Sequence, residues 1–176
     1  VQVHVPDGLK TMMQSQEAAR TAVEAHSDQE LRVPFYCEEN VWRLAYRLKR
    51  QRPHDTFAVV FVSNHLQRVA MFHQRAASNP EHACCWDYHV ILLCKQSAEN
   101  HPLVYDLDSL LPYPTPMVEY LTRSFPLALP NQMAPFFRIV VAELYLAHFA
   151  SSRSHMFDRQ KQTWTATPPT YACINV

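Results

Sequence analysis

Cys37 is the first residue in this sequence whose type and position suggest catalysis. It comes directly before Glu38 and Glu39 and opens a segment whose apolar residues recur at helical spacing. A thiol in the first turn of a helix faces unpaired backbone N–H groups and the positive end of the helix dipole, which favour the thiolate. The thiolate is the form that attacks a carbonyl carbon efficiently. Because the two adjacent carboxylates oppose the dipole, we expect a nearby imidazole to complete such a site.

His89 is the best candidate for that imidazole. It lies among apolar residues in the segment Cys85–Cys94, which predicts one long β-strand. Alternation along a strand would place Asp87 and His89 on one face. Trp86 and Tyr88 would lie on the other face, in the core or in a pocket wall. For any single one of the 10 histidines, a core position satisfied by one backbone carbonyl is the simpler interpretation.

Two aspartates follow on the next predicted strand, which covers about Leu103–Leu107. Asp106 and Asp108 share one face there, and either carboxylate can accept a hydrogen bond from an imidazole and fix its tautomer. A nucleophile at a helix start, a base on a strand and an acid on the following strand is the arrangement of papain-like and transglutaminase-like sites. The pattern alone suggests a thiol enzyme and leaves its reaction open.

Four separated segments resemble, in order and spacing, the motifs of the protein N-terminal glutamine amidohydrolase family. These segments are Tyr36–Trp42, Trp86–Val90 (the WDYHV string), Tyr105–Asp108 and Phe149–Met156. The resemblance extends over about residues 36–174. It implies that the nucleophile is Cys37, the base His89 and the acid Asp106 rather than Asp108.

The resemblance also implies a function. Such an enzyme converts an N-terminal glutamine of proteins or peptides to glutamate and ammonia through a cysteine thioester, and so feeds the N-degron pathway of protein degradation. It implies a monomer of the cytosol and nucleus that uses no cofactor and no metal, with an α-β-α arrangement akin to cysteine proteases and transglutaminases.

Selectivity for a terminal residue requires a group that recognises the free α-ammonium. Glu38, beside the nucleophile, and Asp87, near the base, are our candidates for that carboxylate, because an acetylated amine would leave it buried and unpaired. Trp86 and Tyr88 complete the set of predicted substrate-binding residues. Either acid can instead be a solvated or structural residue.

The elements that must position these residues predict an α+β fold. Cys37–Gln51 is an amphipathic helix that Pro53 ends, and Phe57–Val62 is a strand for which Arg68–Phe72 is the expected hairpin partner. Other expected elements are a helix over 9–26, a helix over Met117–Ser124, a strand over Phe136–Val141 and a helix around Glu143–Phe149. We therefore expect an N-terminal helical extension over residues 1–30 and one catalytic domain over 31–176, with helices packed on a mostly antiparallel sheet.

Composition excludes several other classes of protein. The 16 basic and 16 acidic side chains balance, so no charged surface predicts nucleic acid or an anionic membrane as a partner. The longest apolar runs are too short to span a bilayer, and no secretory signal is visible. The single glycine, Gly8, removes glycine-rich phosphate loops from consideration. Five cysteines without a recurring spacing argue against a disulfide framework and for a reducing compartment.

Two alternatives stay open. The first is another thiol enzyme with the same nucleophile: a cysteine protease, a deamidase of internal glutamines or a transglutaminase-like acyl transferase. The second is a non-enzymatic binding module, in which His82, Cys84, Cys85 and His89 would hold a metal. Adjacent cysteines on a strand point to opposite faces, however, so we expect Cys84, Cys85 and Cys94 to be small buried hydrophobic residues. Arg153, Ser154 and His155 either line the site or stabilise a loop.

Overall fold

The computed structural model describes residues 27–79, 81–99, 101–125 and 133–175. The predicted helix over 9–26 lies outside these ranges. The elements in chain order are η1 (Asp28–Leu31), α2 (Cys37–Gln51), β1 (Thr56–Ser63), β2 (Val69–Met71), β3 (Cys84–Trp86), β4 (His89–Lys95), β5 (Leu103–Tyr105), β6 (Thr115–Pro116), α3 (Met117–Ser124), β7 (Phe136–Val141), α4 (Ala142–His148), η3 (Ser154–Met156), β8 (Phe157–Asp158) and β9 (Thr163–Trp164).

The central feature is a five-stranded sheet with the strand order β6-β5-β4-β1-β7. Each neighbouring pair in it is antiparallel. β1 pairs with β4 from Thr56, opposite Lys95, to Val62, opposite His89, so the predicted base begins the second strand of the longest ladder. Helices pack on an antiparallel sheet, which confirms the α+β prediction.

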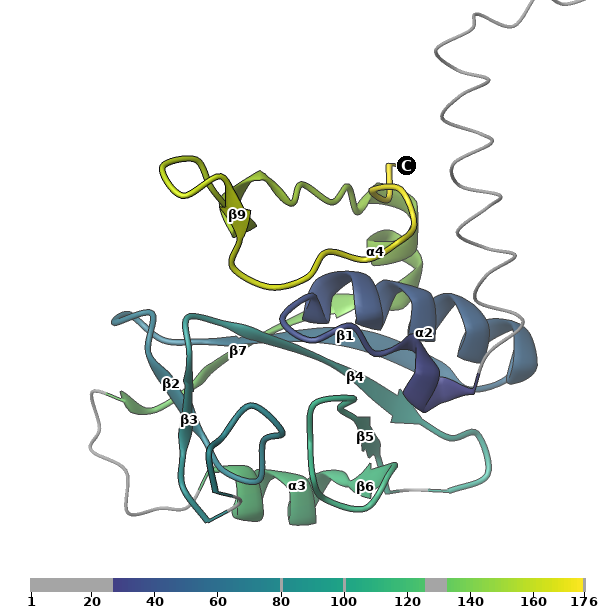
Figure 1. Cartoon of the computed structure of the whole chain (residues 1–176). Coiled ribbons are helices and arrows are strands. Elements are labelled where there is room, and N and C mark those ends of the chain that lie inside the picture. The colour runs from purple at the N-terminus through teal and green to yellow at the C-terminus, as the bar shows by residue number, and fades with distance from the viewer. Residues whose placement is uncertain (1–26, 80, 100, 126–132, 176) are drawn as a thin grey trace, which may run out of the picture.

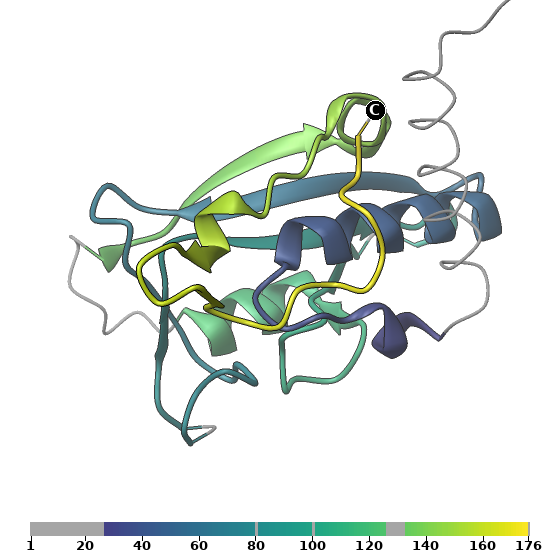
Figure 2. The ribbon, with the colours of Figure 1, turned by 45° about the horizontal axis from the view of Figure 1, so that its top comes forward.

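The two faces of the sheet, which different helices cover in Figures 1 and 2, bury separate hydrophobic clusters. Helices α2 and α4 cover one face, where Trp42 and Leu48 pack with Leu92. Helix α3 and the β2–β3 hairpin cover the other face, where Tyr120 packs with Ile91. The alternation of β4 explains the division, because successive side chains of a strand point to opposite faces.

Helix α2 has the predicted bounds. Five apolar residues of one stripe are buried, namely Val41, Trp42, Leu44, Ala45 and Leu48. Acidic residues occupy its first turn and basic residues its last turn, which suits the helix dipole at both ends. The predictions of α3 and β7 also match the observed bounds, and α4 lies one residue earlier than predicted.

Three strand predictions were wrong. β5 ends at Tyr105 rather than at Leu107, so Asp106 and Asp108 follow the strand and do not share one of its faces. β2 pairs with β3 in a separate two-stranded sheet and not with β1. The predicted long strand Cys85–Cys94 is broken at Asp87, whose Oδ1 accepts the backbone N–H of Tyr88 at 2.9 Å. An aspartate that bonds neighbouring backbone in this way competes with a β ladder. The break sends β3 to the hairpin and β4 to the main sheet, so strand alternation does not relate Asp87 to His89.

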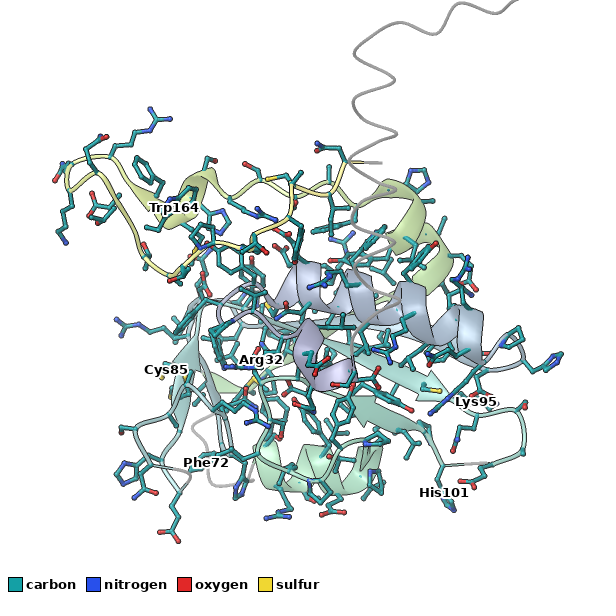
Figure 3. The ribbon with its side chains drawn as sticks, turned by 45° about the vertical axis from the view of Figure 1, so that its right-hand side comes forward. Arg32, Phe72, Cys85, Lys95, His101 and Trp164 are labelled. Atoms are coloured by element: carbon teal, nitrogen blue, oxygen red, sulfur yellow. The ribbon has the colours of Figure 1, made fainter. Side chains whose placement is uncertain are left out.

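The chain after α4 has little regular structure and lies across α2 (Figure 2). The Tyr36 hydroxyl donates to the Ala166 carbonyl at 3.2 Å, and the Ser151 N–H donates to the Ile174 carbonyl at 2.7 Å. Side chains fill the spaces between these layers (Figure 3). Within the described ranges, every helix is too short or too polar to cross a membrane.

Candidate active site

The loop before α2 is fixed to the first turn of that helix, which places Cys37. The Asn40 side chain accepts the Val33 N–H at 2.9 Å and donates to the Val33 carbonyl at 2.8 Å. Phe35 takes a positive φ of 68°, which is unusual for a bulky residue and is held by the surrounding contacts. Its ring packs edge-on against Trp86, with centroids 5.7 Å apart. The helix therefore begins at Cys37 in a constrained position.

The Cys37 thiol at the start of α2 lies close enough to the His89 imidazole at the start of β4 to affect its ionisation. His89 is fully buried, and the nearby Cys37 side chain helps to raise the pKa of the His89 imidazole. The His89 Nε2 atom faces Asp106, so the thiol lies on the side of Nδ1. Among the described residues, Nδ1 has no hydrogen bond of ordinary geometry. This nitrogen is therefore available to exchange a proton with the sulfur.

Asp106 fixes the other nitrogen of the ring. His89 Nε2 lies 2.9 Å from Asp106 Oδ1, and both side chains are almost completely buried. The other hydrogen bonds to this carboxylate come from the Asp108 N–H at 2.9 Å, the Tyr120 hydroxyl at 2.8 Å and Gln74 Nε2 at 3.1 Å. An ionised carboxylate only accepts, so Nε2 carries the proton that it donates to Asp106.

The pair stabilises both of its charges. Burial opposes ionisation of His89, yet the adjacent Asp106 carboxylate, helped by Cys37, raises the pKa of His89 well above its ordinary value. Burial also opposes ionisation of Asp106, but His89, Tyr120 and Gln74 together lower the pKa of Asp106. Opposite charges and hydrogen bonds to the charged form thus outweigh desolvation at both groups.

Asp108 has a different partner. Its Oδ1 accepts a hydrogen bond from Arg32 Nε at 2.7 Å (Arg32 is labelled in Figure 3). Burial raises the pKa of Asp108. Of the two aspartates that the sequence left open, Asp106 is therefore the one that contacts His89.

One group of at least three potential metal ligands exists within the described ranges. It consists of His89, Asp106 and Asp108, whose ligand atoms lie within 4.8 Å of one another. Protein donors already bond both carboxylates, as described above. The alternative set of His82, Cys84, Cys85 and His89 is not brought together. Cys94 is buried as expected, but Cys85 is exposed, because β3 belongs to the outlying hairpin rather than to the main sheet.

A cavity of about 380 Å³ opens beside Cys37. Its wall includes the predicted substrate-binding residues Trp86, Asp87 and Tyr88. The Trp86 ring stacks on His89, with ring centroids 5.2 Å apart and an angle of 17° between the planes. An apolar ring over the imidazole holds its orientation and keeps water from that face. We call this cavity the Cys37 cleft.

A smaller, more enclosed cavity of about 20 Å³ also borders Cys37. Glu38, Tyr88 and His155 contribute to its wall. Burial raises the pKa of Glu38, while a hydrogen bond from Tyr88 and the nearby His155 act in the opposite direction. Asp87, by contrast, is exposed. The structure thus places Glu38 in an enclosed position and Asp87 at the open edge of the cleft.

Arg153 connects the C-terminal tail to α2. Its Nε and Nη2 atoms bond the two carboxylate oxygens of Glu39 at 2.8 and 2.6 Å, and Glu39 is 3% exposed. Arg153 Nη1 also donates to the Tyr171 carbonyl at 2.8 Å. A two-point Arg–carboxylate pair of this kind is geometrically specific. Arg153 therefore stabilises the loop and also borders the small cavity, while His155 lines both cavities.

Sequence reasoning missed two side chains that support Asp106. Gln74 belongs to the loop after β2, and Tyr120 lies on α3, on the opposite side of the sheet from α2. No local pattern marks Gln74. Tyr120 lies on the buried face of a predicted helix, so its burial was foreseeable but its hydroxyl partner was not.

Comparisons with known proteins agree with the motifs. A sequence model of the family described as "N-terminal glutamine amidase" matches residues 32–176. A Drosophila pseudoobscura pseudoobscura protein named Protein N-terminal glutamine amidohydrolase is 42% identical over 146 residues, which cover 81% of this chain and 70% of that protein. An Arabidopsis thaliana protein of the same name is 43% identical over 151 residues, or 80% of this chain and 66% of that protein. The chain thus spans about two thirds of the length of these relatives.

Proposed function

Since this chain belongs to the N-terminal glutamine amidase family, we propose that it hydrolyses the side-chain amide of an N-terminal glutamine on proteins or peptides. The products are an N-terminal glutamate and ammonia. The observation that carries the proposal is the contact of the Cys37 thiol with a buried His89–Asp106 pair at the wall of an open cleft. A thiol, an imidazole and an orienting carboxylate are the parts that acyl transfer requires.

The reaction follows from these parts in two steps. The Cys37 sulfur attacks the carboxamide carbon, and its proton passes to His89 Nδ1. The tetrahedral adduct collapses to a thioester when the C–N bond breaks and His89 gives that proton to the departing ammonia. Neutral His89 then removes a proton from water as the water attacks the thioester, which releases glutamate and returns the proton to the sulfur.

Charge stabilisation has an identifiable source at each point. A protonated imidazole beside a thiol favours the thiolate, and the raised pKa of His89 favours the protonated ring. Asp106 holds the ring so that Nδ1 faces the sulfur throughout both steps. We assign the oxyanion of the adduct to the backbone N–H of Cys37, because the first N–H groups of a helix have no partner within the helix.

Recognition of the free α-ammonium is assigned to Glu38. The enclosed cavity of about 20 Å³ beside it has room for roughly one water-sized group, which matches an ammonium. Burial raises the pKa of Glu38 although His155 lies nearby, and among the described residues no cation forms an ion pair with this carboxylate, so a substrate ammonium would supply one. Asp87, exposed at the edge of the cleft, is the less favoured candidate, and Trp86 and Tyr88 form the wall.

The same proposal extends to the scaffold and to the role in the cell. A nucleophile on a helix, a base on a strand and an acid after the next strand support a papain- or transglutaminase-like arrangement. Residues 31–176 would form the catalytic domain, acting as a monomer. Conversion of N-terminal glutamine to glutamate would feed the N-degron pathway in the cytosol and nucleus.

The test is ammonia release and mass change on a peptide that begins with glutamine. We expect a gain of about one mass unit, the change from an amide to an acid through an acyl-enzyme. The gain should require a free amine and should be absent with Cys37→Ala. Folded, reduced protein that releases no ammonia contradicts the proposal. Turnover of internal or acetylated glutamine would instead favour a general deamidase or a transglutaminase-like enzyme, and peptide cleavage would favour a protease.

A further inference from the structure

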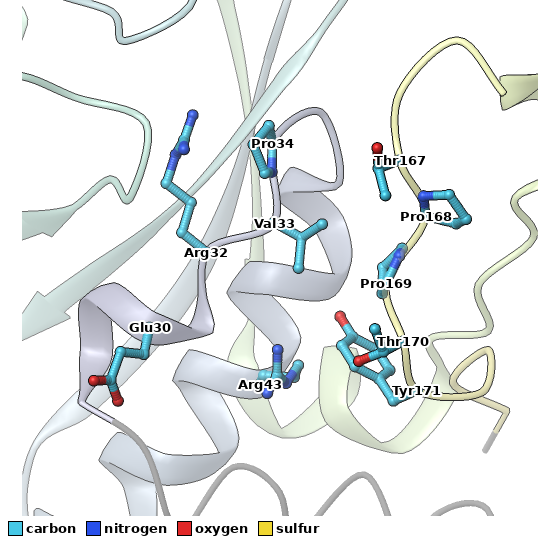
Figure 4. Close-up of a pocket in the computed structure, with 10 residues that line it drawn as sticks. All are labelled: Glu30, Arg32, Val33, Pro34, Arg43, Thr167, Pro168, Pro169, Thr170 and Tyr171. Carbon is cyan, nitrogen blue, oxygen red and sulfur yellow. The ribbon is translucent and has the colours of Figure 1, made fainter.

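A second cavity, of about 400 Å³, lies between the segment that precedes α2 and the C-terminal tail. Figure 4 shows residues 32–34 on one side and residues 167–170 on the other, with Arg43 and Tyr171 between them. We call this cavity the Arg43 groove. It is separate from the two cavities at Cys37.

Arg43 is a buried cation without a counter-charge. Arg43 is only 4% exposed, yet among the described residues its guanidinium forms no ion pair. Its contacts are one hydrogen bond from Nη1 to the Leu31 carbonyl at 3.2 Å and the face of the Tyr171 ring, 4.4 Å from the guanidinium carbon. Burying a charge is costly unless a counter-charge or hydrogen bonds replace the lost water. Arg153, by comparison, is paired with Glu39.

Two buried donors beside the groove also lack acceptors. Within the part of the chain that the structure describes, neither Arg43 Nε nor the Tyr171 hydroxyl has a hydrogen bond of ordinary geometry, although the two side chains are close enough for Arg43 to oppose the rise in the pKa of Tyr171 that burial causes. Both groups can donate, and one of them carries a positive charge. A ligand that satisfies them must therefore offer acceptor oxygens and a negative charge, as a carboxylate does.

Other charges at the groove do not reverse this preference. Arg32 is engaged with Asp108, so its positive charge is balanced. Glu30 lies at one end of the groove, where its Oε2 accepts the backbone N–H of Ser27 at 2.8 Å. Glu30 is exposed, so water screens its charge, whereas the charge of Arg43 is buried at the groove.

The groove lies next to the Cys37 cleft, and the Tyr36–Ala166 hydrogen bond joins the two bordering segments between them, so a bound polypeptide would pass over this bond. Phe35 and Thr165 line the cleft, while Pro34 and Thr167 line the groove, so the same two chain segments border both. Cys37 and Arg43 are six residues apart on α2, which separates them by about 120° around the helix and by about 9 Å along its axis. An extended polypeptide advances about 3.3 Å per residue and covers that distance in about three residues.

We infer that the Arg43 groove binds an acidic side chain of the substrate polypeptide, about three to six residues after the terminal glutamine. This inference rests on the proposed function, because it requires a polypeptide whose first residue occupies the cleft. It makes the enzyme selective for acidic segments that follow the terminal glutamine.

The test uses ten-residue peptides that begin with a free glutamine and are otherwise neutral. One aspartate is moved through positions 3 to 8, and each peptide is compared with its asparagine counterpart. We expect kcat/KM to be about tenfold higher with aspartate at one or two adjacent positions, mainly through KM, because a charge-assisted hydrogen bond forms there. Added inorganic phosphate should reduce that advantage.

Three variants assign the preference to the groove. Arg43→Met should bring the ratio of kcat/KM between the aspartate and asparagine peptides to about one. Thr170→Glu, at an exposed position of the tail, should also suppress it by placing a carboxylate in the groove, and this variant serves if Arg43→Met does not fold. Arg50→Met, on the exposed end of the same helix, should leave the ratio unchanged.

The outcomes separate this inference from the proposed function. Turnover of the neutral peptides without an aspartate preference at any position overturns the groove alone. A preference that survives in both Arg43→Met and Thr170→Glu also overturns it. Failure to turn over any glutamine peptide contradicts the proposed function, and the groove inference falls with it.

Discussion

The Cys37 thiol adjoins two regions, the His89–Asp106 pair and the cavities that Glu38 and Asp87 line. The first region is buried, and Asp106 accepts hydrogen bonds from four protein groups. The second region borders two cavities, and its carboxylates have few protein donors.

The difference separates two tasks. A carboxylate such as Asp106, whose hydrogen bonds come from the protein itself, holds the same geometry with or without substrate. This suits groups that transfer a proton during the reaction. A carboxylate beside an empty enclosed space has its partner supplied by a ligand, which suits recognition. Changes in the first region should therefore act on kcat, and changes in the second region on KM and selectivity.

The largest effect should come from Cys37, which borders both regions. We expect Cys37→Ala to lower kcat by at least about 10⁴-fold, because the thiol that adjoins the His89–Asp106 pair is lost. The thermal midpoint should change little, since the side chain is only half-buried. Ammonia release measures the first quantity and thermal unfolding followed by circular dichroism the second. Residual turnover within a hundredfold of the parent would remove Cys37 from the nucleophile role.

Asp106→Asn should produce the next largest effect. The variant keeps the size of the side chain but no longer holds the proton on His89 Nε2, which lowers kcat by about 10³- to 10⁴-fold in comparable triads. Breaking a buried charge pair should also cost about 3–5 kcal/mol of unfolding free energy. Steady-state kinetics and urea unfolding measure the two effects.

Asp108→Asn is the matched control for that variant. Asp108 is equally buried, but its partner is Arg32 rather than His89. We expect a loss of stability with kcat reduced by less than about tenfold. Equal kinetic losses in the two variants would mean that Asp106 acts only by supporting the fold.

Glu38→Gln should act on selectivity rather than on rate. Losing the carboxylate should raise KM for a free-amine peptide by about ten- to a hundredfold, since a buried charge partner is worth roughly 1–3 kcal/mol. The preference over an N-acetylated peptide should fall by the same factor. Asp87→Asn, at the exposed edge, should change KM by less than about threefold. A larger rise in KM with Asp87→Asn than with Glu38→Gln would mean that Asp87 binds the α-ammonium.

The sequence predicted the helix that carries Cys37 more accurately than the strand that carries His89. Cys37–Gln51 has an apolar stripe of helical period, charges that suit both ends and a proline just beyond, so local signals agree with the tertiary packing. Cys85–Cys94 is continuously β-prone, and its break depends on Asp87 bonding the next backbone N–H and on Trp86 joining a separate hairpin. The spacing of apolar residues alone does not reveal such a break in a strand.

The partners of the predicted residues were even less visible. Gln74 and Tyr120 approach Asp106 from elements that are distant in sequence, and only the folded chain brings them together. Asp106 and Asp108 are equivalent by local pattern, and Arg32 distinguishes them through a contact 76 residues away in the chain. Long-range pairing of this kind leaves no periodic signal, so the motifs predict the site residues but not their supporting network.

The smallest effect is a dependence of stability on pH, which distinguishes the charged pair from the open acids. The pKa of His89 is raised in the folded state. Its contribution to the free energy of unfolding is therefore complete below the unfolded-state pKa of about 6.5 and is lost as pH rises through the folded-state pKa. The folded-state pKa of Asp106 is lowered, so its contribution is present above about 3.9 and is lost only as pH falls through the folded value. Both contributions are therefore complete between these limits.

Between about pH 6.5 and 8.5 the thermal midpoint of the parent chain should decline because of His89. The buried Cys94 thiol, whose pKa is raised to about 11, lowers the stability only above the ordinary thiol value of about 8.5, so it does not contribute in this range. His89→Gln and Asp106→Asn should each be less stable at pH 6 and should lack this slope, because neither retains the charged pair. Glu38→Gln should keep it, because Glu38 belongs to the open region. Thermal unfolding of the four proteins at half-unit pH intervals provides the comparison. A slope that persists in both His89→Gln and Asp106→Asn would assign the titration to another group and would remove the imidazolium–carboxylate pair as the source of rigidity on the buried side of the thiol.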